Sequence, residues 1–242
     1  MEVPEAVRRF VVAVETRARS VLADHDPEYV AKAQEILRTN FAGLTHPESR
    51  RFLKSQPRWR LDAQWTGTLE SAYNLHLHAE LYILAFRQLE SCVVIKPSAD
   101  QVLAFDLALR HWVIQAQALV ESTKVAITRA VRRDDRSRRK KDELFTRILD
   151  KLTESQIKFE RLRDPWLHAE GKTGIALGGI TDAKLWEQAV AIGLFEKKGI
   201  EWAHEHKAPF MAKWHSGAIK THPKILEIIS QALTGVLDGL GW

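Results

Sequence analysis

The chain reads LESAYNLHLHAELYILAFRQLESCVVIKPSAD over residues 69–100, and this stretch decides the fold. Apolar residues recur at helical spacing over about 61–95, with no proline and only Gly67 as an interruption, which predicts one long helix. The polar link 96–100 contains a proline and ends that helix, and a second long apolar run follows over about 100–131. A short link between two such helices predicts an antiparallel helical hairpin at the centre of a bundle.

Shorter helices are predicted on both sides of this hairpin, from apolar spacing and from helix-start residues such as Asp26-Pro27-Glu28. The sequence shows no strand pattern, no heptad seam and no internal repeat, so the predicted class is all-α. The domain prediction is an N-terminal helical extension over 1–60 and a bundle with C-terminal helices over 61–242, or one continuous domain. The flanking helices are predicted over about 4–24, 26–44, 45–57, 142–163, 182–206 and 223–240, with a glycine-rich loop over 171–179 and a less regular piece between the last two helices.

The composition favours a soluble protein with an anionic partner. The 242 residues carry a formal charge of +5, which favours nucleic acid or a membrane surface without deciding between them. No apolar run reaches the roughly 18 residues that span a bilayer, and the N-terminus lacks the layout of a secretory signal, so a cytoplasmic protein is expected. Cys92 is the single cysteine, has no partner for a disulfide within the chain, and is expected to be a small core residue.

An arginine, an acid and a histidine lie close together in the segment RLRDPWLHAEG, residues 161–171. On one continuous helix, Arg163 and His168 would point about 140° apart, because each residue turns the helix by about 100°. Pro165 changes this, since its ring disfavours the helix that precedes it. One helix is expected to end near Arg163, and Asp164 is expected to cap the next helix, so that the Arg163 side chain is free to turn toward His168.

This segment resembles the Arg-x4-His signature of the HEPN superfamily, with Asp164 in the small polar position directly after the arginine. The resemblance covers roughly residues 61–170: the hairpin, the helix after it and the motif. It implies a HEPN-like helical bundle, a homodimer that pairs two motifs, and an RNA-cleaving activity that needs no metal and no cofactor. It also implies a toxin–antitoxin or antiviral defence setting, with an antitoxin or other protein as a partner. The sequence departs from the pattern at Asp164, where asparagine is frequent, and at Pro165 and Trp166.

The residue types suit metal-independent cleavage of RNA. Attack of a 2′-hydroxyl on the neighbouring phosphate needs a proton acceptor, a proton donor and a cation for the phosphate oxygens. Histidine suits the proton step because its pKa lies near neutral pH, and arginine offers a planar fork that matches phosphate. The resemblance assigns these roles to His168 and Arg163. One histidine does not easily serve as both acid and base, so a two-fold dimer makes chemical sense.

A dense cationic run lies shortly before the motif helix. Such a run binds phosphates through charge alone, and its binding weakens steeply with salt. The alternative is a solvated helix end or loop, which is the more common fate of charge runs. The candidate nucleic-acid-binding residues are Arg132, Arg133, Arg136, Arg138, Arg139, Lys140 and Lys141.

Two other functions stay open at this point. In the first, the chain is a non-catalytic all-α interaction or scaffold module, Asp164-Pro165 is only a helix start, and Arg163 and His168 have structural roles. In the second, it is a helical enzyme with a histidine-based metal site. That site has weak support, because only His76 and Glu80 share a helical face and a stable metal site usually needs three or more ligands.

Overall fold

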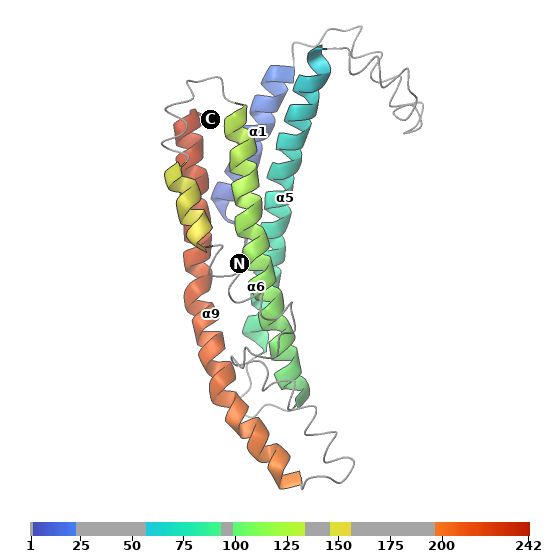
Figure 1. The fold of residues 1–242 in the computed structure, drawn as a ribbon, viewed down its shortest axis with the longest axis vertical. Helices are drawn as coiled ribbons and strands as arrows, with labels where there is room; N and C mark the ends of the chain where they lie inside the picture. The colour runs from blue at the N-terminus through green and yellow to red at the C-terminus, as the bar shows by residue number, and fades with distance from the viewer. Residues whose placement is uncertain (1, 23–56, 93–98, 134–145, 156–196) are drawn as a thin grey trace, which may run out of the picture.

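The computed structural model describes residues 2–22, 57–92, 99–133, 146–155 and 197–242, and these residues form long helices (Figure 1). The labelled helices are α1 (Glu5–Leu22), α5 (Pro57–Ser91), α6 (Ala99–Arg132) and α9 (Lys197–Leu240). Residues 146–155 form a further short helix, drawn in yellow, and no strand occurs in the described ranges. The prediction of an all-α helical bundle is confirmed.

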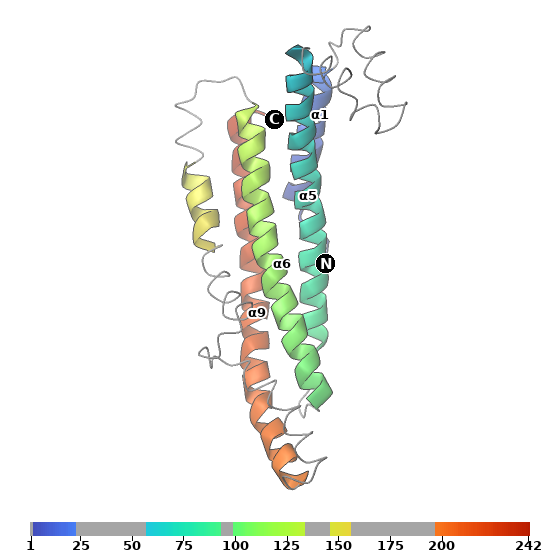
Figure 2. The same cartoon turned by 45° about the vertical axis from the view of Figure 1, so that its right-hand side comes forward.

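The long hairpin at the centre of the bundle is confirmed as well. α5 and α6 lie side by side along most of their length and run in opposite directions (Figures 1 and 2). α1 packs against α5 and α9, and α6 packs against α5 and α9, so the labelled helices surround one core. The C-terminal ends of α1, α6 and α9 lie at the same end of the bundle as the N-terminal end of α5.

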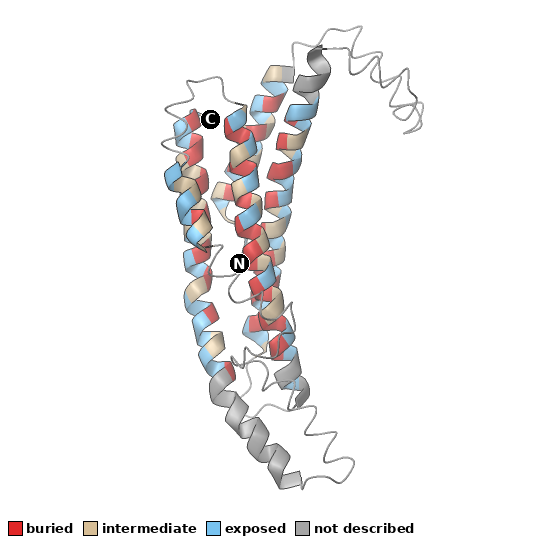
Figure 3. Ribbon diagram, in the orientation of Figure 1, coloured by how far each residue is buried: buried red, intermediate tan, exposed pale blue. Residues whose placement is uncertain are grey.

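The hairpin is held by apolar side chains that recur every three or four residues on each helix. This spacing brings them onto one face, and Figure 3 shows the buried residues as stripes that face the neighbouring helices. Each large apolar side chain removed from water stabilises the fold by about 1.5–3 kcal/mol. The central buried residues are Leu75, Ala79, Tyr82, Phe86 and Leu89 on α5, and Phe105, Leu109, Trp112, Ala116 and Leu119 on α6.

α1 belongs to the same core as the hairpin. Val7, Phe10, Val14 and Ala18 repeat at helical spacing and are all buried. They join the residues of α5, α6 and α9 in a continuous apolar cluster, apart from Ala18, which is buried beside it. The predicted N-terminal helix therefore packs as an integral part of the bundle. The other two helices predicted before residue 57 lie outside the described residues.

The C-terminal helix differs from the sequence-based prediction. The sequence predicted a break between about residue 206 and Pro223, whereas α9 is one continuous helix through this region. Proline removes one backbone hydrogen bond and crowds the preceding turn, which disfavours a helix interior. The helix persists because its buried face continues on both sides of the proline: Ala218, His222, Ile225 and Ile229 are all buried. The predicted start of the preceding run, at about residue 182, lies outside the described residues.

Several buried polar groups in the hairpin have partners one turn away in their own helices. Thr68 and Thr123 donate hydrogen bonds to carbonyl oxygens one turn earlier in their own helices, at 2.8 and 2.7 Å. Asp106 is only 3% exposed, and its carboxylate binds Arg110 through two contacts, of 2.9 and 3.1 Å. Burial raises the pKa of Asp106, and Arg110 partly offsets this effect. The hairpin thus buries one charge by supplying its cation one turn away.

Cys92 is partly buried and packs against the edge of the core at the end of α5. Its thiol lies 3.0 Å from the carbonyl oxygen of Gln88. In the part of the chain that the structure describes, no helix has both the length and the apolar character needed to cross a membrane.

Candidate nucleic-acid interface

The motif residues Arg163, Asp164 and His168 lie outside the described residues, and so do the basic-run residues from Arg136 to Lys141. The described part of the basic run consists of Arg132 and Arg133. α6 ends at Arg132, and the amide of Arg133 still bonds to the carbonyl oxygen of Ala130 at 3.0 Å. The start of the basic run is therefore fixed at one end of the bundle.

Two arginines near the end of α6 hold the hairpin together. Arg129 donates a hydrogen bond to the backbone oxygen of Gly67, and Arg133 donates one to the side-chain oxygen of Gln64. The pKa of Arg133 is lowered, first by burial and second by the nearby charge of Arg132. Arg132 is exposed and has no ion-pair partner among the described residues. Of these three guanidinium groups, Arg132 is the one that faces solvent without such a contact.

The C-terminal ends of the helices give a structural reason for arginines at this end of the bundle. The unpaired carbonyl groups at a helix C-terminus carry partial negative charge, and a nearby cation stabilises them by about 0.3–1 kcal/mol. The last turn of α1 contains Arg19, and the last turn of α6 contains Arg129 and Arg132. The C-terminal ends of α1, α6 and α9 meet at this end of the bundle. Part of the cationic character of this surface thus stabilises the fold.

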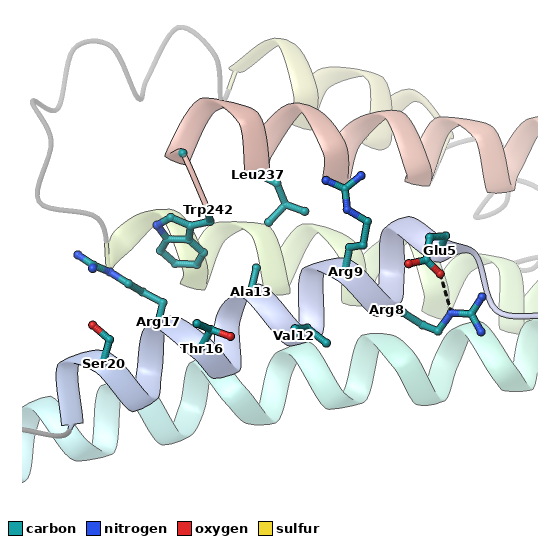
Figure 4. Close-up of a pocket in the computed structure, with 11 residues that line it drawn as sticks. Glu5, Arg8, Arg9, Val12, Ala13, Thr16, Arg17, Ser20, Leu237 and Trp242 are labelled. Carbon is teal, nitrogen blue, oxygen red and sulfur yellow. Dashed lines mark hydrogen bonds and ion pairs between the residues drawn. The ribbon is translucent and has the colours of Figure 1, made fainter.

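A groove with a basic rim lies between α1 and the end of α9 (Figure 4). Its volume is about 610 Å³, which falls within the usual range of ligand sites. Apolar side chains from both helices form its floor, and side chains of α1 form its rim. The groove is lined by Glu5, Arg8, Arg9, Val12, Ala13, Thr16, Arg17, Ser20, Leu237, Gly241 and Trp242.

Trp242 is held at this groove by the way α9 ends. Gly241 has a positive φ of 65°, a conformation that glycine adopts without strain. The amide of Gly241 bonds to Asp238 and the amide of Trp242 bonds to Leu237, at 3.3 and 3.0 Å. This pair of bonds is a Schellman cap, which folds the residue after the glycine back over the last turn. Trp242 therefore lies beside Leu237 and faces α1 (Figure 4).

The rim of this groove carries more positive than negative charge. Arg8 is neutralised by Glu5 at 3.1 Å and by Glu2 at 3.5 Å. Arg9 and Arg17 are exposed, and neither has an ion-pair partner among the described residues. The sequence alone predicts no site at Arg9, Arg17 or Trp242. A glycine at position 241 after an apolar helical run was a sequence signal for the cap. Arg9 and Arg17 belong to α1, so no local pattern connects them with this cap.

A second groove, between α5 and α6, is polar. It has a volume of about 430 Å³ and contains the buried Nδ1 atom of His78, which has no hydrogen-bond partner in the described part of the chain. No group of three or more metal-binding side chains occurs among the described residues. The Nε2 atom of His76 lies 3.4 Å from the Oε1 atom of Glu80, and these two side chains form a pair. The groove is lined by Glu70, Ser71, Asn74, His78, Ala118, Glu121, Ser122, Val125 and Arg129.

Comparisons of this chain with protein-family models, with curated proteins and with solved structures found no match.

Proposed function

We propose that this chain is a HEPN-like RNA-binding protein that cleaves RNA without a metal ion, with Arg163, Asp164 and His168 at the active site of a homodimer. The order of its parts carries the proposal: a long antiparallel hairpin, a basic run that starts at the exposed end of α6, and then the Arg-x4-His motif. The described helices α5 and α6 are the hairpin in this order of parts. The motif supports the chemistry.

The proposed reaction is an internal transfer at phosphorus. The 2′-hydroxyl loses its proton to a histidine and attacks the adjacent phosphate, and the bond from phosphorus to the 5′-oxygen breaks. A second histidine donates a proton to that oxygen, which leaves a 2′,3′-cyclic phosphate and a free 5′-hydroxyl. In a homodimer, His168 of each chain takes one of these roles. Arg163 stabilises the negative phosphate oxygens, and Asp164 orients the histidine or the arginine.

The basic run is the proposed RNA-binding surface. Arg132 is exposed where the described part of the run begins, and further cations follow it in the sequence. Each phosphate that the protein neutralises releases a counterion, so affinity falls with salt. We expect RNA binding to weaken steeply as the salt concentration rises. A variant with Arg136, Arg138 and Arg139 changed to glutamine is expected to bind more weakly and to have a shallower salt dependence, and an unchanged salt dependence would argue against this surface.

Cleavage is tested with labelled single-stranded RNA in the presence of a chelator. Wild type is expected to give products that end in cyclic phosphate, and His168→Ala is expected to lose at least about a hundredfold in rate, the usual contribution of a general acid or base. His76→Ala is the matched control, because His76 has Glu80 as a described partner and lies outside the motif. If wild type gives no product on a broad set of RNAs, or His168→Ala cleaves equally well, the nuclease part of the proposal is wrong.

The second candidate is a non-catalytic interaction or scaffold module. The structural roles of Arg129 and Arg133 at the end of the hairpin favour it, since they show that arginines in this region hold helices together. Simple measurements distinguish the two functions. A scaffold binds RNA or protein without cleavage, whereas a nuclease in a toxin–antitoxin system arrests growth when it is produced in cells without its partner, and His168→Ala removes that arrest. Sedimentation of the purified protein tests the homodimer.

A further inference from the structure

The groove between α1 and the end of α9 has three features that suit a single strand of nucleic acid: cations on its rim, an apolar floor, and an aromatic ring at one end (Figure 4). Proteins that bind single strands combine a positive groove, which follows the backbone, with aromatic side chains on which bases stack. None of the described residues that line the groove belongs to the Arg163–His168 motif or to the basic run.

The two rim arginines are available for phosphate. Arg9 and Arg17 lie eight residues apart on α1, which corresponds to about 12 Å along the helix axis. Their charges are not neutralised by another described residue, whereas Glu5 is already paired with Arg8. Thr16 and Ser20 add hydroxyl groups to the same rim. This side of the groove therefore attracts an anion that extends along α1.

The floor of the groove suits a flat apolar group. Val12 lines the groove and is 58% exposed, so it offers apolar surface to a bound group. On the α9 side Leu237 is already buried, and the partly exposed Trp242 is held at the groove by the Schellman cap at Gly241. A base that stacks against Trp242 would remove this apolar surface from water. The same surface gives no favourable contact to a simple inorganic anion.

The groove reaches the end of the bundle at which the basic run begins. The ring of Trp242 lies 6.3 Å from the ring of Trp65 on α5. The residue before Trp65 is Gln64, whose side chain accepts the hydrogen bond from Arg133. The groove and Arg133 therefore both lie beside the first part of α5, at the same end of the bundle. One strand can lie in the groove and continue over this end of the bundle.

We infer that this groove binds a segment of single-stranded RNA, with phosphates at Arg9 and Arg17 and a base against Trp242. The inference rests on the proposed RNA-binding function and adds a second contact surface to it. An acidic helix from a partner protein is the competing occupant, since it also offers negative charge and apolar side chains. The continuity with the basic run favours RNA.

The experiment uses the full chain and a labelled, unstructured 2′-O-methyl RNA, which has no 2′-hydroxyl to attack the phosphate. Fluorescence anisotropy measures its affinity over a range of salt concentrations. The double variant Arg9→Gln/Arg17→Gln is expected to bind at least about tenfold more weakly, with a salt slope that is smaller by about 1.4, the value for two lost phosphate contacts on a single strand. Lys213→Gln/Lys224→Gln removes the same charge from exposed positions of α9 away from the groove and is expected to change the affinity less than about twofold.

The base contact has its own readout. An RNA strand that carries iodouridine is expected to photocrosslink to Trp242, and Trp242→Phe is expected to retain more affinity than Trp242→Ala because it keeps an aromatic ring. Circular dichroism shows that each variant is folded before its affinity is compared.

Three outcomes overturn the inference. If the groove variant and the lysine control bind RNA equally, the groove is not an RNA site, while the proposed RNA-binding function stands on the basic run. If a labelled glutamate-rich helical peptide binds and loses affinity in the groove variant while RNA binding does not change, the groove is a protein-binding site. If wild type binds no RNA, the proposed function fails and this inference fails with it.

Discussion

The Nδ1 atom of His222 on α9 lies 3.0 Å from the hydroxyl oxygen of Tyr82 on α5, a residue 140 positions earlier in the chain. The imidazole ring stacks on Phe86, with ring centres 3.8 Å apart and planes within 9°, and also on Tyr82. His222 is only 4% exposed. Burial lowers the pKa of His222 to about 4 and raises the pKa of Tyr82. A neutral imidazole therefore fixes α9 to the hairpin.

We expect this pair to make the bundle less stable in acid. The folded-state pKa of His222 lies below its usual value of 6.5, so the unfolded chain binds the proton more readily. Stability is fully present above the unfolded pKa and is lost as the pH falls toward about 4, by at most about 3 kcal/mol. Urea unfolding at a series of pH values measures this loss.

The double variant Tyr82→Phe/His222→Phe is the control for this prediction. It keeps the aromatic packing and removes both the titrating ring and the hydroxyl group that binds it. Its free energy of unfolding is expected to depend less on pH than that of wild type between neutral pH and the folded pKa. An equal pH dependence of the two proteins would mean that other groups cause the acid sensitivity.

The buried Asp106 depends on its arginine. We expect Arg110→Met to destabilise the protein by about 3 kcal/mol, because the carboxylate loses the cation that offsets its burial. The double variant Asp106→Leu/Arg110→Met removes the charge as well and is expected to recover most of the loss. Chemical unfolding of the three proteins at neutral pH makes the comparison, and a double variant as unstable as Arg110→Met would contradict the explanation.

Gly217 lies in the interior of α9, and a methyl group added there would meet no atom within 4 Å. Gly217→Ala is expected to stabilise the protein by about 0.5–1 kcal/mol, because alanine reduces the conformational freedom of the unfolded chain. The matched variant is Gly235→Ala, whose new methyl group would contact Ile148 at 3.5 Å. Thermal unfolding is expected to show a rise in midpoint for Gly217→Ala. A fall would mean that α9 is not a regular helix at this position.

The cap at the end of α9 depends on glycine. Gly241→Ala is expected to destabilise the protein by roughly 1 kcal/mol, because a residue with a Cβ atom is strained at positive φ. Gly241→Asn is the control, since asparagine tolerates this conformation better. Thermal unfolding ranks the variants, and equal midpoints for alanine and asparagine would argue against the cap.

The hairpin was predictable because its signal is local. Long apolar runs and a short polar link specify two helices and their antiparallel order, and α5 and α6 begin and end within a few residues of the predicted limits. Which apolar residues face the core was harder to predict. Leu107 and Ile114 belong to the same run as Trp112 and Leu119, yet the first two are exposed, at 59% and 40%, and the last two are buried. Their exposure depends on where the neighbouring helices lie.

The candidate site was also predictable only in part. The local density of charge predicted Arg132 and Arg133 as nucleic-acid-binding residues. It could not predict the hydrogen bond of Arg133 with Gln64, because Gln64 lies on another helix. The groove of Arg9, Arg17 and Trp242 combines the two ends of the chain, so no sequence window contains it. The Arg163–His168 motif stays a prediction, since it lies outside the described residues.

The sequence by itself determined the helical class, the hairpin and the start of the basic run, because helix periodicity and charge are properties of neighbouring residues. The tertiary structure decided that α9 continues through Pro223, that His222 binds Tyr82, and that α1 meets the capped end of α9. These features depend on contacts between residues far apart in the chain. These contacts stabilise the protein only after the helices have packed together. The pattern of neighbouring residues therefore does not predict them.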